Sequence, residues 1–203
     1  VNSKIAKRTE VEVMERSIQD LKEAETLLIA NYPGTERIRI NRSTAQALLA
    51  RMYLYTSNWE NARRYADMLI NNGLYNLEPL EDVFKKESKS AIWQLKPTTP
   101  GFNTYEAYYH IFTSVPAPFF KLAPSLLEAF EPTDRRKEQW LHSVGTTQNY
   151  AHAFKYKVKG MSAVTEEYTV VVRLEEMYLI AAEAAIMEGD LQTGSDLLNV
   201  IRN

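Results

Sequence analysis

The stretch that decides the fold is residues 41–77, NRSTAQALLARMYLYTSNWENARRYADMLINNGLYNL. Apolar residues recur in it at the spacing of one helical face, on both sides of the polar hinge SNW. Asn41 or Ser43 can cap the first helix, and Gly73 can end the second because glycine readily adopts the left-handed conformation that closes many helices. We therefore expect a helical hairpin over residues 41–73.

A second hairpin is indicated 132 residues further along the chain, over residues 174–203. Small residues fall at matching points of the two hairpins, and two helices cross closely only where side chains are small. A bulky residue at the hinge completes a pattern typical of tetratricopeptide-like repeats. The aligned pairs are Leu48 and Ile180, Ala50 and Ala182, Trp59 and Leu191, Ala62 and Gly194, and Leu69 and Ile201.

Further elements are expected outside the hairpins. A capping box at Thr9 and Glu12 begins an N-terminal helix, which we expect to continue to Pro33. Residues 78–172 are expected to form an insertion of loops and short strands between the hairpins. Its expected elements are strands at 90–97 and 168–174, a helix at 124–130, and an alternating face of Tyr150, His152, Phe154, Tyr156 and Val158.

The sequence thus predicts a mainly α fold, an α-α superhelix of tetratricopeptide-like helical hairpins with a few short β-strands and long loops. We expect residues 1–203 to form a single domain. The chain does not begin with methionine, and a helical pattern is still running at its last residues. We therefore expect it to be an internal piece of a longer protein.

The composition argues against several classes of function. The 203 residues are 45% hydrophobic and 25% charged, and a net charge of −2 gives no strong field of either sign. We therefore expect no nucleic-acid partner. The absence of cysteine excludes disulfides, thiolate metal sites and cysteine nucleophiles. No apolar run is long enough to cross a bilayer.

The sequence carries no recognisable catalytic motif. It contains no nucleophile paired with a base, no phosphate-binding glycine loop and no histidines at metal-ligand spacing. The carboxylates of Glu166-Glu167 and Glu175-Glu176 are adjacent in sequence, so on a helix they would diverge and could not flank one glycosidic bond. We therefore expect a protein that is not an enzyme and that has no metal and no cofactor.

Several segments resemble the SusD/RagB-type nutrient-binding outer-membrane lipoproteins. Residues 45–77 resemble the first hairpin of that family. The more specific match is VVVRLEEMYLIAAEAAIMEGDLQTGSDLLNVIRN at 170–203, which is similar to its Arg-led apolar helix, AEA, Gly-Asp turn and Leu-Asn-x-Ile-Arg. The shorter matches are SAIWQLKP at 90–97, LLEAFEPTDRRK at 126–137, which has an extra residue between Asp134 and Arg136, and AFKYK at 153–157.

The resemblance implies a protein that binds an oligosaccharide or another nutrient without cleaving it. It further implies a location at the cell surface of the outer membrane, with a SusC-like, TonB-dependent outer-membrane transporter as partner. Contact with the membrane would then be made only through a lipid anchor that lies outside this chain. Residues 97–118 match no part of the family pattern, so the resemblance names no particular sugar.

Residues 97–118 are nevertheless the best candidate for sugar binding. A sugar ring has apolar C–H faces and a polar rim, so its site needs flat aromatic rings and hydrogen-bonding side chains. This stretch supplies both between flanking prolines, and we expect it to be an exposed, irregular loop. The candidate ligand-binding residues are Phe102, Asn103, Tyr105, Tyr108, Tyr109 and Trp140.

Alternatives remain open at this point. Tyr105, Tyr108, Tyr109 and Phe112 have the spacing of one helical face, so they could instead be one face of a short helix buried against the hairpins. The hairpins could serve a protein–protein interaction adaptor that holds a peptide on its concave surface. A glycoside hydrolase is a third possibility.

Three further expectations concern packing. We expect Trp59 to plug the gap between two helices and Trp93 to lie in the core. Arg51 and Glu183 interrupt apolar helices, and an unpaired buried charge costs several kcal/mol. Each is therefore expected to pair with an opposite charge or to reach solvent, and Arg173, Asp134 and Arg136 are the other candidates for such a network.

Overall fold

The computed structural model describes residues 7–115, 121–146 and 149–202. The described chain forms two compact units. We call the first the helical unit; it contains residues 7–35, 39–75 and 174–202. The second is the insertion unit, which contains residues 36–38 and the described part of 76–173. The prediction of a single domain stays a prediction.

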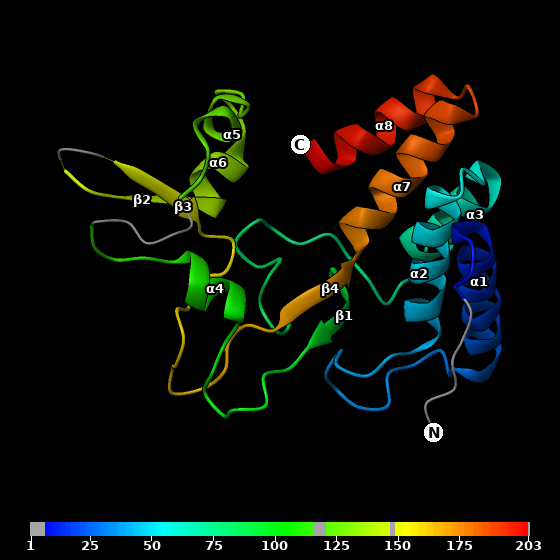
Figure 1. Cartoon of the computed structure of the whole chain (residues 1–203), viewed down its shortest axis with the longest axis horizontal. Coiled ribbons are helices and arrows are strands. Elements are labelled where there is room, and N and C mark those ends of the chain that lie inside the picture. The colour runs from blue at the N-terminus through cyan, green and yellow to red at the C-terminus, as the bar shows by residue number, and fades with distance from the viewer. Residues whose placement is uncertain (1–6, 116–120, 147–148, 203) are drawn as a thin grey trace. The chain divides into compact units, whose positions relative to one another are not determined.

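The helical unit contains both predicted hairpins and the N-terminal helix. Its helices are α1 (Glu10–Leu27), α2 (Arg42–Tyr55), α3 (Trp59–Ile70), α7 (Leu174–Met187) and α8 (Leu191–Arg202). The helices pack in the order α1, α2, α3, α7, α8, so the two hairpins meet where α3 lies against α7 (Figure 1). The mainly α fold is confirmed.

Side-chain caps explain where these helices begin. Thr9 and Glu12 form the expected capping box of α1, and Asn41 caps α2 by accepting a hydrogen bond from the Thr44 N–H at 3.0 Å. The expectation that α1 continues to Pro33 is wrong, because the helix ends at Leu27. Beyond that point the backbone is held to the start of α2: the N–H of Arg42 donates to the carbonyl of Ile29 at 2.9 Å.

Small residues form the contacts between helices, as the aligned hairpins predict. Ala50, Ala62 and Ala182 are completely buried, and Gly194 of α8 is buried as well. A Cβ atom at Gly194 would lie 2.4 Å from Cγ1 of Ile186. Only glycine therefore fits at this crossing of α7 and α8 without a shift of its neighbours.

The bulky hinge residues do not behave alike. Trp59 is half-buried, whereas its aligned partner Leu191 is 65% exposed and plugs no gap. Trp93, which we expected in the core, is also only half-buried. A bulky residue at the second hinge is therefore not required for the packing of α7 on α8.

The two charged residues within the apolar helices are placed as expected. Arg51 of α2 forms a bidentate ion pair with Glu176 of α7, with nitrogen–oxygen distances of 2.6 and 2.8 Å. Glu183 is exposed to solvent. The Glu176 carboxylate raises the pKa of Arg51, mainly through this hydrogen bond. Asp134 instead pairs with Arg136, at the start of another helix.

The insertion unit contains two small antiparallel sheets and three short helices. In the first sheet β1 (Ala91–Leu95) pairs with β4 (Thr169–Arg173), and in the second β2 (Leu141–Val144) pairs with β3 (Tyr150–Ala153). The helices are α4 (Tyr105–His110), α5 (Pro124–Glu128) and α6 (Arg135–Trp140). Its core contains Val83, Phe84, Ala107, Ile111 and Tyr156.

The structure corrects two expectations for this unit. Residues 97–118 are not wholly irregular, because α4 lies within them. The expected alternating face over 150–158 ends early: β3 stops at Ala153, since its partner β2 has only four residues. Residues 116–120 and 147–148 lie outside the described part. No helix in the described ranges has the length and apolar character needed to cross a membrane.

Candidate functional site

The candidate site is built on helix α4 of the insertion unit. Thr104 caps this helix by accepting a hydrogen bond from the N–H of Ala107 at 3.1 Å. Ala107 is the residue of α4 that faces the core, where it packs in the cluster with Phe84 and Tyr156. The tyrosines of the helix are left to solvent: Tyr105, Tyr108 and Tyr109 are 65%, 48% and 55% exposed.

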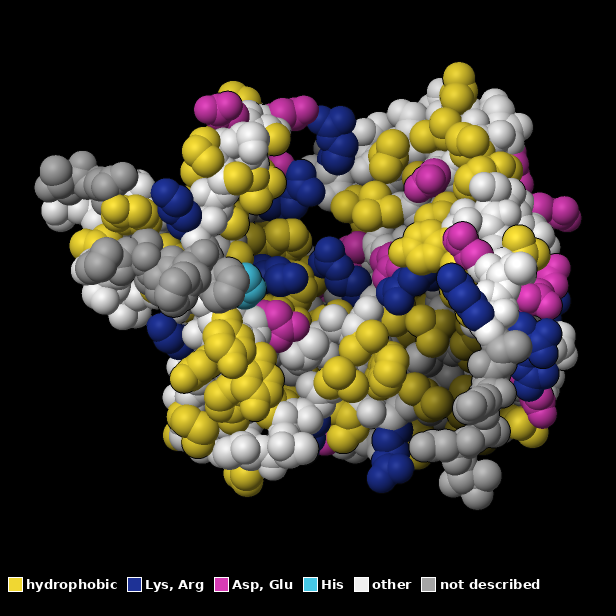
Figure 2. All heavy atoms as spheres, in the orientation of Figure 1, with side chains coloured by type: hydrophobic (Ala, Val, Ile, Leu, Met, Phe, Trp, Pro, Cys, Tyr) yellow, Lys and Arg dark blue, Asp and Glu magenta, His cyan; other side chains and the backbone are white. Residues whose placement is uncertain are grey.

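These tyrosines form one aromatic surface together with Phe102, and we call the four residues the tyrosine patch. The ring centroids of Phe102 and Tyr105 are 4.9 Å apart, and those of Tyr108 and Tyr109 are 5.2 Å apart. Tyr105 and Tyr109 are nearly parallel, at 21° with centroids 6.1 Å apart. Hydrophobic side chains accordingly gather over α4 in the space-filling view (Figure 2).

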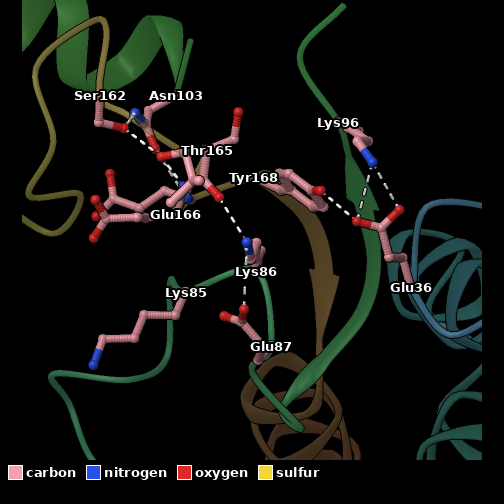
Figure 3. Close-up of polar contacts among 12 residues, drawn as sticks. Glu36, Lys85, Lys86, Glu87, Lys96, Asn103, Ser162, Thr165, Glu166 and Tyr168 are labelled. Atoms are coloured by element: carbon pink, nitrogen blue, oxygen red, sulfur yellow. Dashed lines mark hydrogen bonds and ion pairs between the residues drawn. The ribbon is translucent and has the colours of Figure 1, made fainter. Parts of the chain in front are cut away.

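The buried amide of Asn103 anchors the start of the patch. Its nitrogen donates to the Gly160 carbonyl at 3.1 Å and to the Ser162 hydroxyl at 2.8 Å. Its oxygen accepts hydrogen bonds from the N–H groups of Glu166 and Glu167 at 2.8 and 3.0 Å. Figure 3 shows Asn103 beside two of these partners, Ser162 and Glu166. The side chain thus ties the segment before α4 to the segment that precedes β4.

Two more contacts hold α4 and its support in place. The Thr169 hydroxyl of β4 donates to Glu106 of α4 at 3.0 Å. The buried Glu167 carboxylate accepts hydrogen bonds from the N–H groups of Lys157 and Val158 at 2.6 and 3.1 Å. Burial raises the pKa of Glu167, and these two donors oppose the increase. These hydrogen bonds therefore fix the backbone segments that support the tyrosine patch.

A close approach of two chain segments also fixes the edge of the patch. Gly101 has a φ of +78°, and a Cβ there would lie 2.7 Å from the Ser162 carbonyl oxygen. The neighbouring Phe102 forms a backbone bridge with Met161, whose side chain is 62% exposed. Met161 therefore extends the apolar surface beside Phe102. No sequence pattern indicates this role of Met161, because the bridge joins residues 59 positions apart.

The structure separates the six candidate residues into two groups. Phe102, Tyr105, Tyr108 and Tyr109 lie together on the surface, whereas Asn103 and Trp140 do not belong to it. Asn103 is completely buried and its amide is fully used within the chain, so it cannot bind a sugar hydroxyl directly.

Trp140 is half-buried against the core cluster that also contains Ala107. Its ring meets Phe84 edge-on at 5.4 Å, and its N–H donates to the carbonyl of Leu80 at 2.9 Å. We therefore leave Trp140 out of the site.

The alternative of a buried aromatic helix is half right. Residues 105–110 do form a helix, but its tyrosines point to solvent, and Phe112 is buried beyond its end. Flat exposed rings with hydroxyl groups can stack on apolar ring faces and exchange hydrogen bonds with polar rims. No cluster of three or more metal-ligating side chains occurs in the described ranges.

Comparison with known proteins gives a consistent result at the level of structure. No family model matches the sequence, and no curated protein matches it significantly. A SusD superfamily protein from Bacteroides vulgatus is 26% identical, with a TM-score of 0.71 over 94% of this chain and 46% of that one. A SusD-like carbohydrate-binding protein from the same species is 24% identical, with a TM-score of 0.73 over 94% and 42%.

A third solved structure extends the match to the whole chain. This SusD superfamily protein from Bacteroides thetaiotaomicron has a TM-score of 0.81 over 100% of this chain and 51% of its own, at 15% identity. The present chain thus spans about half the length of the structures that it matches. The TM-scores and the coverage of nearly the whole chain show that this chain has the fold of the SusD superfamily proteins that it matches.

Proposed function

We propose that the tyrosine patch is a carbohydrate-binding surface of a SusD-type protein. The observation that carries the proposal is the exposure of three tyrosines on a helix whose opposite side is fixed in the core. A solved structure with the same fold is described as a carbohydrate-binding protein, which supports the same ligand class here.

The patch suits this task because it is aromatic, exposed and held in place before the ligand arrives, and because the Tyr105 and Tyr109 rings are nearly parallel. Sugar rings stack their C–H faces on such rings, while hydroxyl groups at the ring edge can bond to the tyrosine hydroxyls. The hydrogen bonds of Asn103, Glu106 and Glu167 fix the helix and its supporting segment. Binding then orders little of the chain, which reduces its entropic cost.

The finer proposal concerns the whole protein. A SusD-type protein would hold the oligosaccharide, or another nutrient, at the outer surface of the bacterium without cleaving it. It would then pass the ligand to a TonB-dependent outer-membrane transporter. The likeness to SusD-like solved structures supports this part of the proposal, and co-purification of such a transporter with the full-length protein from its native membrane would test it.

A binding experiment tests the patch directly. A glycan array first identifies a ligand, and calorimetry then compares the wild-type chain with Tyr105→Ala and Tyr109→Ala. Each substitution removes one stacking ring, and we expect its affinity to fall by about tenfold, or about 1.4 kcal/mol. The matched control is Tyr55→Ala, because Tyr55 is equally exposed, at 66%, but lies on α2 of the helical unit.

Other results of these measurements would contradict the proposal in different ways. Unchanged affinity in both patch variants would contradict the proposed site. Binding of a peptide, but of no glycan, that is lost only on substitution of the helical hairpins would favour the peptide-binding adaptor. Release of shorter sugars from the ligand would show a hydrolase and contradict binding without cleavage.

A further inference from the structure

Two histidines form a hydrogen-bonded pair across the small sheet of β2 and β3. His142 of β2 lies directly opposite His152 of β3 in the antiparallel register. The hydrogen bond joins Nδ1 of His142 to Nε2 of His152 at 3.4 Å. His142 is exposed, whereas His152 is completely buried. The pair therefore connects a ring that can exchange protons with solvent to a ring that lies in the interior.

The neighbours of His152 determine which nitrogen carries each proton. Nδ1 of His152 lies 3.0 Å from the carbonyl oxygen of Ala153, and it must be protonated because a carbonyl oxygen only accepts. Nε2 of the neutral ring is then the acceptor, and Nδ1 of His142 donates to it. An added proton can bind at Nε2 of the exposed His142 and leaves this contact intact. A further proton, at Nε2 of His152, would direct two N–H groups at each other.

His152 also connects this sheet to the helix that carries the tyrosine patch. Its ring centroid lies 4.5 Å from that of Phe112, which is buried and follows the end of α4 by two residues. Ile111, which lies between α4 and Phe112, belongs to the core cluster of the insertion unit. Movement of His152 would therefore remove packing from the segment that ends α4.

We propose that His142 and His152 form a pH switch that controls how firmly α4 is held. At neutral pH the pair keeps the β2–β3 sheet packed against Phe112. In mild acid both rings become protonated, the two N–H groups repel each other, and the sheet moves away from Phe112. The expected effect on a ligand, weaker binding at the tyrosine patch, rests on the proposed function.

The electrostatic surroundings of His152 give the switch its direction. Burial lowers the pKa of His152, the positive charges of protonated His142 and of Lys159 lower it further, and the hydrogen bond to Ala153 opposes the decrease. Opening of the sheet returns His152 to water, where it binds a proton more readily. Acidification below about pH 6.5, the ordinary pKa of histidine, therefore favours the open form.

Most of the other charged groups around the sheet act in the same direction. In the described ranges they are Lys137 and Glu138 of α6, Lys121 before α5, and Lys157 and Lys159 after β3. Glu138, which lines one groove together with His142, is the single anion in this set. A second positive charge in the pair thus meets mainly positive neighbours, which disfavours the closed form in acid.

Hydrogen exchange of the full chain, measured by mass spectrometry at about pH 7.5 and about pH 5, tests the switch. After correction for the intrinsic pH dependence of exchange, protection of residues 150–153 and 105–112 should fall by about tenfold in acid. His142→Gln should remove most of this fall, because an amide can donate to neutral His152 or accept from protonated His152. The control is His110→Gln, which alters the third histidine of the chain, outside the pair, and should keep the fall.

Protection that is equal at the two pH values, or that falls equally in His142→Gln, would overturn the switch. Loss of the response in His110→Gln would overturn it as well. Calorimetry with a glycan ligand adds a second readout, since affinity should also fall by about tenfold in acid, and less in His142→Gln. Affinity that is independent of pH would overturn the link to α4. A chain that binds no glycan but loses protection in acid would contradict the proposed function and support the switch.

Discussion

At the scale of single residues, Gly194 has the tightest surroundings among the glycines of the helical unit. Its missing side chain lets α8 approach α7 so closely that a Cβ would also lie 3.0 Å from the Ala182 carbonyl oxygen. The aligned position of the first hairpin is Ala62, which is completely buried. Both helix crossings therefore depend on a small residue, but at the second crossing even a Cβ atom does not fit.

Gly194→Ala is therefore expected to destabilise the protein, although alanine normally favours a helix. The new methyl group forces Ile186 or the helix axis to move, which typically costs about 1 to 3 kcal/mol. Urea denaturation followed by far-ultraviolet circular dichroism measures the change. The control is Gly73→Ala, since a Cβ at Gly73 meets nothing within 4 Å. Equal stability of the two variants would show that α8 is loosely held.

At the scale of elements, the caps made the helical hairpins predictable. Asn41 caps α2 as predicted, whereas α3 ends at Ile70 with Asn71 as its C-cap, and Gly73 follows without the left-handed conformation expected of it. Helix α6 was missed because its residues, RRKEQW, have no apolar period; its start depends on Asp134, which accepts a hydrogen bond from the N–H of Arg136.

Helix α4 shows why only part of the candidate site could be predicted. The spacing of its tyrosines correctly indicates a helix, and their chemistry indicates a binding surface, but the sequence does not show whether that helix face is buried or exposed. The deciding fact is that small Ala107, not the tyrosines, packs against Phe84. Sequence spacing does not reveal which side of a short helix the rest of the chain covers. Likewise, the sequence does not show that His142 lies opposite His152, because this depends on the register of the two strands.

The ion pair of Arg51 and Glu176 joins α2 to α7, and a double-mutant cycle with Arg51→Met and Glu176→Gln measures its contribution. Both side chains are less than one-third exposed, at 26% and 28%, and their contact is bidentate. We expect a coupling free energy of about 1 to 2 kcal/mol from denaturation curves.

The surface pair of Arg16 and Asp20 on α1 provides the comparison for that cycle. These side chains are 73% and 54% exposed, and their spacing is that of an ordinary pair on one helix. Such pairs contribute about 0.3 to 0.5 kcal/mol. A coupling for Arg51 and Glu176 no larger than this would mean that the contact adds no specific link between the hairpins.

At the scale of the whole molecule, the helical unit is discontinuous in sequence. Its α1 to α3 precede the insertion unit, and α7 and α8 follow it. Helix α7 supplies fully buried residues to the unit, among them Met177, Ala181 and Ala184. Helix α3 packs against both α2 and α7, so part of its cover within the helical unit comes from α7.

Two deletions test this organisation. Removal of residues 174–203 takes away the cover that α7 gives to α3, and we expect the remaining helices to lose cooperative thermal unfolding. Replacement of residues 76–173 by a Gly/Ser linker should preserve a cooperative helical transition, because each buried contact within the helical unit remains. Circular dichroism during heating distinguishes the two. Cooperative unfolding of the first variant would contradict the dependence of the N-terminal helices on α7.

Because the helical unit is discontinuous in sequence, its first and last helices leave the ribosome at different times. About a hundred residues separate the end of α3 from the start of α7. At about 5 to 20 residues per second, translation leaves the side of α3 that packs on α7 uncovered for on the order of 5 to 20 seconds. During that interval the nascent helices expose apolar surface, as chaperone substrates do. The yield of native protein would then depend on a chaperone that shields this surface rather than on early local folding.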